Sequence, residues 1–311
     1  MLNSYYYIAY KKLDFASRTA QYDLQLPLNL DIIVLCASKG VSMLRKSFIC
    51  FIILVITNWG YTAPKLLEPN WGAFNATNKT SINHSTWQYL LTQYLYKGSD
   101  NVNLFHYDSV TPKDKKALNA YLEYLQSLNI QQYNREQQLA YWINLYNAKI
   151  VSIILDYYPI DSITSINLSN NPFEIGPFST KTLHVLGYPL SLRDINLKIL
   201  HKFWHDPRII FTLNTAAIGS PNLSRQAYEG HHIEQLLEDA TFNFINSPRA
   251  VQINYHRLNV SKIFSWYRQD FGNNDAAIIQ YLQQYATPKL SKKLMNTHSI
   301  AGSFFDWSLN G

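Results

Sequence analysis

One segment, residues 135–158, limits what this chain can fold into more than any other. It reads as a single helix that starts near Arg135 and ends before Pro159, because the residue before a proline disfavours the α conformation. Its apolar residues occupy nearly every side of that helix: Leu139, Trp142, Ile143, Leu145, Tyr146, Ile150, Val151, Ile154 and Leu155. A helix that is apolar all round has to be covered on every side. We therefore expect it at the centre of the domain.

Two amphipathic helices are predicted before this central one. In the first, large apolar residues recur at helical spacing: Trp87, Leu90, Leu91, Tyr94 and Leu95. The second begins after Thr111 and Pro112, where the threonine hydroxyl is suited to cap the helix and Asp114 lies near its positive end. It continues to about Leu125, and its apolar residues also follow one face.

Shorter elements follow the central helix. Residues 182–186 and 188–190 predict a hairpin around Gly187, and residues 191–194 fit a capping box that opens a helix ending near Trp204. The β-branched and aromatic run at residues 209–213 predicts a buried strand, followed by a Gly-Pro loop at residues 219–221.

The last third alternates between helices and strands. Helical patterns cover residues 233–246 and 275–286, and strand-like patterns cover residues 251–253 and 258–260. The folded part contains no repeat and no long linker. The sequence therefore predicts one α+β domain, mostly helical, with a small antiparallel sheet.

The N-terminal region resembles an export signal. From Met43 the chain reads Met-Leu-Arg-Lys, then the nine-residue apolar run 48–56, then a small and polar stretch ending at Ala63. Such a run is too short for a helix across a bilayer of roughly 30 Å. We expect translation to start at Met43, so that residues 1–42 are an extension without a function and residues 43–63 a signal peptide. Pro64 and the bulky Tyr61 suit cleavage poorly, which leaves a retained inner-membrane anchor as the alternative.

On this interpretation residues 64–86 form an irregular lead-in, residues 87–311 form the domain, and the protein is periplasmic or extracellular. The only cysteines, Cys36 and Cys50, lie before residue 64, so the exported chain carries no thiol. The first 63 residues hold six Lys or Arg and three Asp or Glu, so 21 basic and 18 acidic residues remain. Such a small surplus, without a basic face, argues against a nucleic-acid partner. We expect membrane contact only through an uncleaved signal.

Six segments, in order and in spacing, resemble the DUF547 family. They are residues 141–147 (YWINLYN), 158–163 (YPIDSI), 190–195 (LSLRDI), 206–209 (DPRI), 214–221 (NTAAIGSP) and 260–267 (VSKIFSWY). Residues 84–87 and 271–272 extend the likeness, so it covers nearly all of the predicted exported chain. The resemblance implies an α+β fold that has been likened to papain-type thiol hydrolases. A fold by itself does not fix the chemistry.

The chain departs from the family pattern at the positions that would carry such chemistry. Where the family typically reads Asn-Cys-Ala-Ser-x-Gly-Cys-Pro, this chain has Thr215 and Ser220 at the two cysteine positions. Where the family reads Ile-Glu-His and Arg-Ile-His, this chain reads Ile-Asn-Leu at 195–197 and Arg-Ile-Ile at 208–210. A thiol hydrolase needs an acidified cysteine, a base and a group that orients the base. All three are substituted at the matching positions.

Two substitutes for the missing thiol remain open. Thr215 or Ser220 is a weak candidate for an oxygen nucleophile, because a hydroxyl needs a base within about 3 Å, and His231 or His232 would have to be recruited from the following loop. His201 and His205, four apart on a predicted helix, are weak candidates for metal ligands, but no third ligand is apparent. We expect no cofactor.

Polar residues in the apolar central helix predict a buried network or a pocket. Asn144 and Asn147 lie three apart next to Trp142, and their amides are expected to face one buried polar spot shared with Asn214 or Arg208. A buried amide without a partner costs on the order of 1–3 kcal/mol. We favour a structural network that ties the helix to the Asn214 loop, with a ligand pocket as the alternative.

Two functions follow from these observations. The first, which we prefer, is an exported and catalytically degenerate domain that binds a small ligand or a protein in the cleft of its family. The second is a hydrolase that uses a threonine or serine hydroxyl, or a metal, in place of the thiol. The surroundings of Thr215 and Ser220 discriminate between the two.

Overall fold

The computed structural model describes residues 66–255 and 257–311, apart from the side chain of Asp100. Within the unit Glu68–Gly311, the central helix is α6, Arg135–Tyr157. The Asn134 side chain caps it by accepting a hydrogen bond from the Gln137 amide. Nearly every residue of α6 from Gln137 to Ile154 is buried. The predicted central helix is therefore confirmed.

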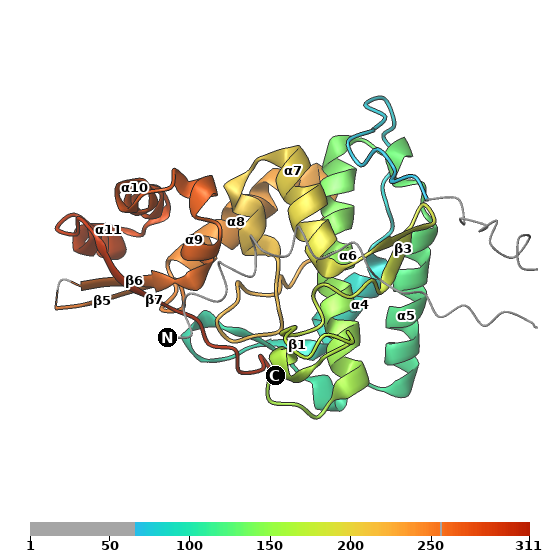
Figure 1. The fold of residues 1–311 in the computed structure, drawn as a ribbon, viewed down its shortest axis with the longest axis horizontal. Helices are drawn as coiled ribbons and strands as arrows, with labels where there is room; N and C mark the ends of the chain where they lie inside the picture. Colours follow the sequence, from blue (N-terminus) through green and yellow to red (C-terminus); the bar gives the residue numbers. More distant parts are fainter. Residues whose placement is uncertain (1–65, 256) are drawn as a thin grey trace, which may run out of the picture. The chain divides into compact units, whose positions relative to one another are not determined.

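Helix α5 (Pro112–Ser127) packs against α6, and helix α4 (Ser85–Tyr94) packs against α5 (Figure 1). The Thr111 hydroxyl accepts a hydrogen bond from the Asp114 amide at 3.1 Å, so the predicted cap is confirmed. Between these helices, strands β1 (Leu95–Lys97) and β2 (Asn103–Phe105) pair as an antiparallel hairpin that the sequence pattern did not reveal. The apolar faces of the three helices meet in a first hydrophobic cluster.

The predicted hairpin and capping box are both present. Strands β3 (Leu183–Val185) and β4 (Tyr188–Leu190) pair across a two-residue turn in which Leu186 and Gly187 both have positive φ. Ser191 and Asp194 then exchange backbone and side-chain hydrogen bonds. The helix after this box differs from the prediction, because Asp194–Leu200 is a π-helix and only His201–Trp204 (α7) is α-helical.

The strand predicted at residues 209–213 is wrong. Residues 209–212 belong to η7, a 3₁₀ helix spanning Pro207–Thr212, and Leu213 follows it as the C-cap. In a strand, Ile209, Phe211 and Leu213 would share one face. Instead Ile209 and Leu213 join the first cluster, while Ile210 and Phe211 join a second one. A helical turn directs these apolar side chains into both clusters, which the alternation of a strand would not do.

The second cluster is built from the last third of the chain. Helix α8 (Ile233–Ile245) is followed by antiparallel strands β5 (Val251–Asn254) and β6 (Arg257–Ser261), as predicted. Three elements were not predicted: α9 (Lys262–Trp266), α11 (Pro288–Leu294) and β7 (Ile300–Phe304). Helix α10 (Asp275–Tyr285) was predicted. Because β7 pairs in parallel with β6, this three-stranded sheet is mixed and not purely antiparallel (Figure 1).

After β7 the chain runs back along residues 216–219. The amides of Ile218 and Gly219 donate to the carbonyls of Ser308 and Asp306, and the Asn310 amide donates to Ala216. Residues 306–310, which we call the C-terminal strap, thus lie along the loop that contains Thr215 and Ser220. The strap holds this loop through backbone hydrogen bonds.

The α+β prediction is confirmed, with helices predominating over three small sheets in the described residues. The likeness to papain-type folds stays a prediction. No helix in residues 66–311 is both long and apolar enough to cross a bilayer. The predicted extension and signal segment, residues 1–63, lie outside the described residues.

Candidate functional site

Thr215 and Ser220 lie at the two ends of a tight loop, and their hydroxyl groups hydrogen-bond to each other. The Ser220 hydroxyl also accepts a bond from the Thr215 amide at 3.2 Å. Ser220 is fully buried, whereas Thr215 is partly exposed. Across the described chain, neither hydroxyl has a histidine or carboxylate as hydrogen-bond partner. The pair can therefore bind each other but lacks a base to activate either oxygen.

One polar residue of α6, Asn147, supports this loop. The Asn147 side chain donates to the Thr212 carbonyl at 2.9 Å and accepts from the Asn214 amide at 2.9 Å. The Asn214 side chain in turn donates to the Pro221 carbonyl and accepts from the Ala216 amide, each at 2.8 Å. The side chains of Asn147 and Asn214 thereby form the hydrogen bonds that the buried backbone N–H and C=O groups of this irregular loop cannot form with each other.

Asn144 serves a different segment. Its side chain donates to the Tyr228 carbonyl at 2.7 Å and accepts from the Tyr228 amide at 3.0 Å. The expectation of one shared polar spot is therefore wrong, because the two amides project to two separate loops on either side of residue 221. Trp142 is buried between Tyr141 and Trp71 and makes edge-to-face contacts with both.

A buried arginine that the sequence did not single out supports the loop from the second cluster. Arg249 is 8% exposed, and its Nη1 donates to the Ser220 carbonyl at 2.7 Å. Its Nε and Nη2 have no hydrogen-bond partner in the described part of the chain. Burial lowers the pKa of Arg249 to about 10. The guanidinium thus lies next to the Thr215–Ser220 loop and pairs with no carboxylate of residues 66–311 that the structure describes.

Two of the other three substituted positions, Asn196 and Ile210, make structural contacts. Asn196, in the π-helix, donates to the Tyr267 hydroxyl at 2.6 Å. Ile210 is buried in the second cluster, so an apolar contact stands where the family pattern has a histidine. Neither position supplies a titratable group to the loop.

Arg208 lies in an ion-pair cluster and not in the asparagine network. Its guanidinium contacts Asp206 at 2.6 Å, Glu234 at 2.9 Å and Glu238 at 2.8 Å. The hydrogen bonds that Arg208 donates to Asp206, followed by those it donates to the two glutamates, raise the pKa of Arg208 above its ordinary value, against the effect of burial. The suggested sharing of Arg208 with Asn144 and Asn147 is therefore wrong.

The histidine candidates are not brought together with a third ligand. His201 pairs with Asp270 at 2.7 Å, and His205 is an exposed residue with left-handed backbone. Within residues 66–311, leaving out His256, no group of three His, Cys, Asp or Glu side chains is suited to hold a metal ion. His231 contacts Glu229 at 3.2 Å and stacks near His232, and neither forms a hydrogen bond with Thr215 or Ser220.

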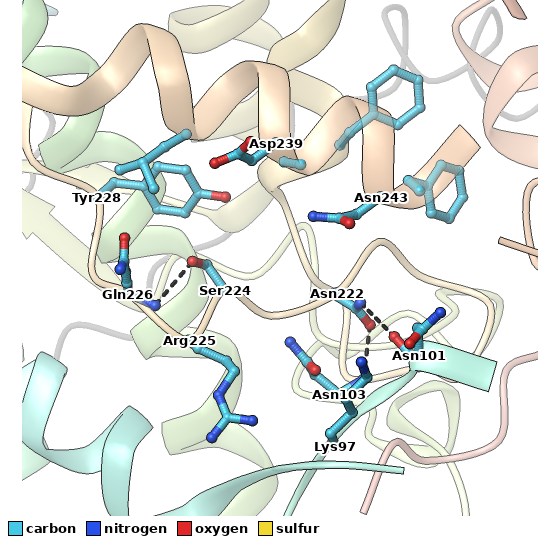
Figure 2. Close-up of a pocket in the computed structure, with 14 residues that line it drawn as sticks. Lys97, Asn101, Asn103, Asn222, Ser224, Arg225, Gln226, Tyr228, Asp239 and Asn243 are labelled. Carbon is cyan, nitrogen blue, oxygen red and sulfur yellow. Dashed lines mark hydrogen bonds between the residues drawn. The ribbon is translucent and has the colours of Figure 1, made fainter. Parts of the chain in front are cut away.

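A cleft of about 440 Å³ lies beside the loop, and we call it the Asn222 cleft. It is lined by β1, by residues 222–228 that follow the loop, and by one face of α8 (Figure 2). Its apolar wall is formed by Phe211, Leu236, Ala240 and Phe244. Thr215 and Ser220 do not line it. The hollow next to the family loop is therefore separate from the two hydroxyls.

The polar wall of the Asn222 cleft is rich in carboxamides. The Asn222 side chain is held at both ends, since it accepts from the Asn103 amide and donates to the Asn101 carbonyl, each at 2.8 Å (Figure 2). Other polar side chains on this wall form no hydrogen bond or ion pair with another described residue: Lys97, Asn101, Arg225, Gln226, Tyr228, Asp239 and Asn243. These side chains are open to a bound ligand.

Tyr228 is the most buried of these unpartnered groups. Its ring is 2% exposed, and burial followed by the nearby charge of Asp239 raises the pKa of its phenol. The hydroxyl therefore remains protonated and can donate a hydrogen bond toward the cleft.

The comparison with known families fits this arrangement. Residues 130–245 match the model of DUF547, described as a protein of unknown function. This segment of the chain is therefore similar to the DUF547 family. The match begins five residues before α6, runs to the end of α8 and includes Asn144, Asn147 and the Thr215–Ser220 loop. No curated protein and no solved structure is significantly similar to the chain.

Two supports of the DUF547 loop lie outside the matched residues. Arg249 follows the match, and the strap residue Asn310 donates a bond from its own backbone to Ala216 while its side chain accepts from the Tyr107 hydroxyl at 2.9 Å. Both residues are isolated polar positions in ordinary sequence surroundings. No local sequence pattern predicts that Arg249 and Asn310 are buried, so the sequence did not identify them as supports of the loop.

Proposed function

We propose that this chain is a catalytically degenerate domain that binds a small ligand in the Asn222 cleft. The observation that carries the proposal is the contact between the Thr215 and Ser220 hydroxyls at the two family cysteine positions. Each hydroxyl satisfies the other, and no described histidine or carboxylate hydrogen-bonds to the pair. A hydroxyl nucleophile without a general base has little reactivity at neutral pH.

The binding part of the proposal rests on the unpartnered side chains of the Asn222 cleft. The protein leaves carboxamide, hydroxyl and charged groups around an apolar wall without using them internally. Ligand sites typically combine such an apolar wall with a few polar groups that fix orientation. The cleft volume of about 440 Å³ suits a small molecule or a short stretch of polymer.

The test is a screen of the full chain for turnover of ester, amide and peptide substrates. Thr215→Ala and Ser220→Ala are compared with Ser127→Ala, an exposed serine on α5. The proposal expects no turnover in any of the four proteins. Turnover that is lost in either loop variant and kept in Ser127→Ala would overturn it in favour of an oxygen-nucleophile hydrolase. Turnover that survives all three substitutions and stops with a chelator would favour a metal-dependent one.

We also propose that the chain is exported, with translation from Met43 and residues 43–63 as the signal. The support is the short apolar run 48–56 after Arg45 and Lys46. Fractionated cells are expected to yield a chain that begins near residue 64 in the periplasm or medium, or an uncleaved chain in the membrane. Recovery from the cytosol with residue 1 at the N-terminus would contradict export.

A further inference from the structure

The charges of the Asn222 cleft are separated. Asp239 and Asn243, one helical turn apart on α8, lie on the same side of the opening as the Tyr228 hydroxyl, whereas Arg225 lies on the opposite side with Lys97 (Figure 2). Among the side chains that the structure describes, neither Asp239 nor the two cations has an ion-pair partner. Opposite charges that do not neutralise each other each attract a counter-charge from a ligand.

The free carboxamides add a second requirement. A carboxamide offers one acceptor and one donor side by side, which matches the C=O and N–H of a peptide group. The molecule already uses this match twice, since Asn144 and Asn147 each accept from a backbone amide and donate to a backbone carbonyl. In the cleft, Asn101, Gln226 and Asn243 present the same groups without a partner among the described residues.

We propose that the Asn222 cleft binds a zwitterionic short peptide. Its ammonium group lies at Asp239, with Asn243 and the Tyr228 hydroxyl beside it, and its carboxylate lies at Arg225 and Lys97. The carboxamides pair with the peptide groups, and an apolar side chain packs on the partly exposed Leu236 and Ala240. This inference rests on the proposed function, because it names the ligand class of the same cleft.

The test uses one tripeptide, Ala-Phe-Ala, in four forms: with free ends, N-acetylated, C-amidated, and blocked at both ends. Binding to the full chain is measured by calorimetry. The free peptide is expected to bind, and each block is expected to weaken binding by roughly tenfold or more, since each removes one charge contact. Equal binding of the doubly blocked and the free peptide would overturn the zwitterion inference, and so would failure of every form to bind.

Charge-removing variants assign the two ends. Asp239→Asn is expected to abolish the difference between free and N-acetylated peptide, and Arg225→Gln to reduce the difference between free and C-amidated peptide. Glu238→Gln, which removes the same charge from the neighbouring position of α8 where the side chain faces Arg208, is the matched control and is expected to change neither. If Glu238→Gln also abolished the differences in affinity between free and N-acetylated peptide and between free and C-amidated peptide, the assignment of the peptide ends to Asp239 and Arg225 would be contradicted.

A neutral disaccharide, cellobiose, separates failure of the inference from failure of the proposed function. Binding of cellobiose without binding of peptide would refute the zwitterion inference and leave a ligand-binding domain. Cleavage of the tripeptide that depends on Thr215 or Ser220 would refute catalytic degeneracy instead, whichever end groups the peptide carries.

Discussion

Arg249 donates from Nη1 to the carbonyl of Ser220 at 2.7 Å, and so connects the turn before β5 to the family loop. The same nitrogen lies 3.5 Å from the Ile218 carbonyl. A charged donor bound to a buried carbonyl contributes roughly 1.5–3 kcal/mol, while burial of a guanidinium without a carboxylate costs several kcal/mol. The two effects oppose each other, so the contribution of Arg249 is to the order of the loop more than to global stability.

Arg249→Met is accordingly expected to loosen the loop without unfolding the protein. Methionine keeps an unbranched apolar stem but loses the bond to Ser220 and the cation–π contact of the guanidinium with the Phe244 ring. Amide hydrogen exchange at residues 215–220 should accelerate by roughly tenfold or more, as expected for the loss of about 1.4 kcal/mol of local stability. Arg257→Met, the same change at an exposed arginine of β6, is the control and should leave this exchange unchanged.

Asn147 is expected to be among the most sensitive polar residues of the domain. Asn147→Ala leaves the Thr212 carbonyl and the Asn214 amide buried without partners, at about 1–3 kcal/mol each. We expect the free energy of unfolding in urea to fall by roughly 2–4 kcal/mol. Glu136→Ala, at an exposed position of the same helix, should cost less than about 1 kcal/mol. A loss below that value for Asn147→Ala would show that water replaces the amide.

Acid should destabilise the domain through His84. Its Nδ1 lies 2.6 Å from the Tyr121 hydroxyl, and burial lowers the pKa of His84 to about 4 from 6.5. Because the unfolded chain takes up a proton first, this contribution is complete above pH 6.5 and is lost as the pH falls toward 4. Between pH 7 and 5 the free energy of unfolding should decrease by about 2 kcal/mol.

Two variants test the assignment to His84. His84→Gln should remove most of the pH dependence between 7 and 5, whereas His106→Gln, at an exposed histidine, should retain it. The measurement is urea unfolding at both pH values. An undiminished pH dependence in His84→Gln would assign the effect to other groups.

Restoring both family cysteines should produce a disulfide. The hydroxyls of Thr215 and Ser220 are in hydrogen-bond contact, which brings their Cβ atoms within reach of the roughly 3.5–4.5 Å that a disulfide requires. Under mild oxidation, the double variant Thr215→Cys with Ser220→Cys should therefore lose two hydrogens by mass spectrometry. Each single variant should keep one reactive thiol. Two free thiols in the oxidised double variant would show that the loop holds these positions apart.

The sequence predicted the elements whose local patterns agree with their packing. Helix α6 was found because its apolar residues lie all round, and the β3–β4 hairpin because Gly187 marks the turn. Strand β7 was missed, since its residues alternate only weakly and its parallel partner β6 is some forty residues away. The 3₁₀ segment η7 was predicted as a strand because β-branched residues dominate it, and tertiary packing overrides that propensity.

The site could be predicted only in part. Asn144 and Asn147 stand out as polar residues in an apolar helix, and their burial follows from that position alone. Their separate partners, the Tyr228 and Asn214 segments, depend on how two loops cross the helix. Arg249 and the charged residues of the Asn222 cleft are ordinary surface types in the sequence. Only the three-dimensional arrangement reveals that one is buried and that the others surround a hollow.

Residues 209–213 also affect how the domain unfolds on heating. Ile209 and Leu213 insert into one hydrophobic cluster while Ile210 and Phe211 insert into the other. Neither hydrophobic cluster can unfold alone, because its unfolding would pull residues 209–213 out of the other cluster as well. Heating should therefore give a single calorimetric peak, with equal van't Hoff and measured enthalpies, in a molecule whose two clusters would otherwise melt one after the other.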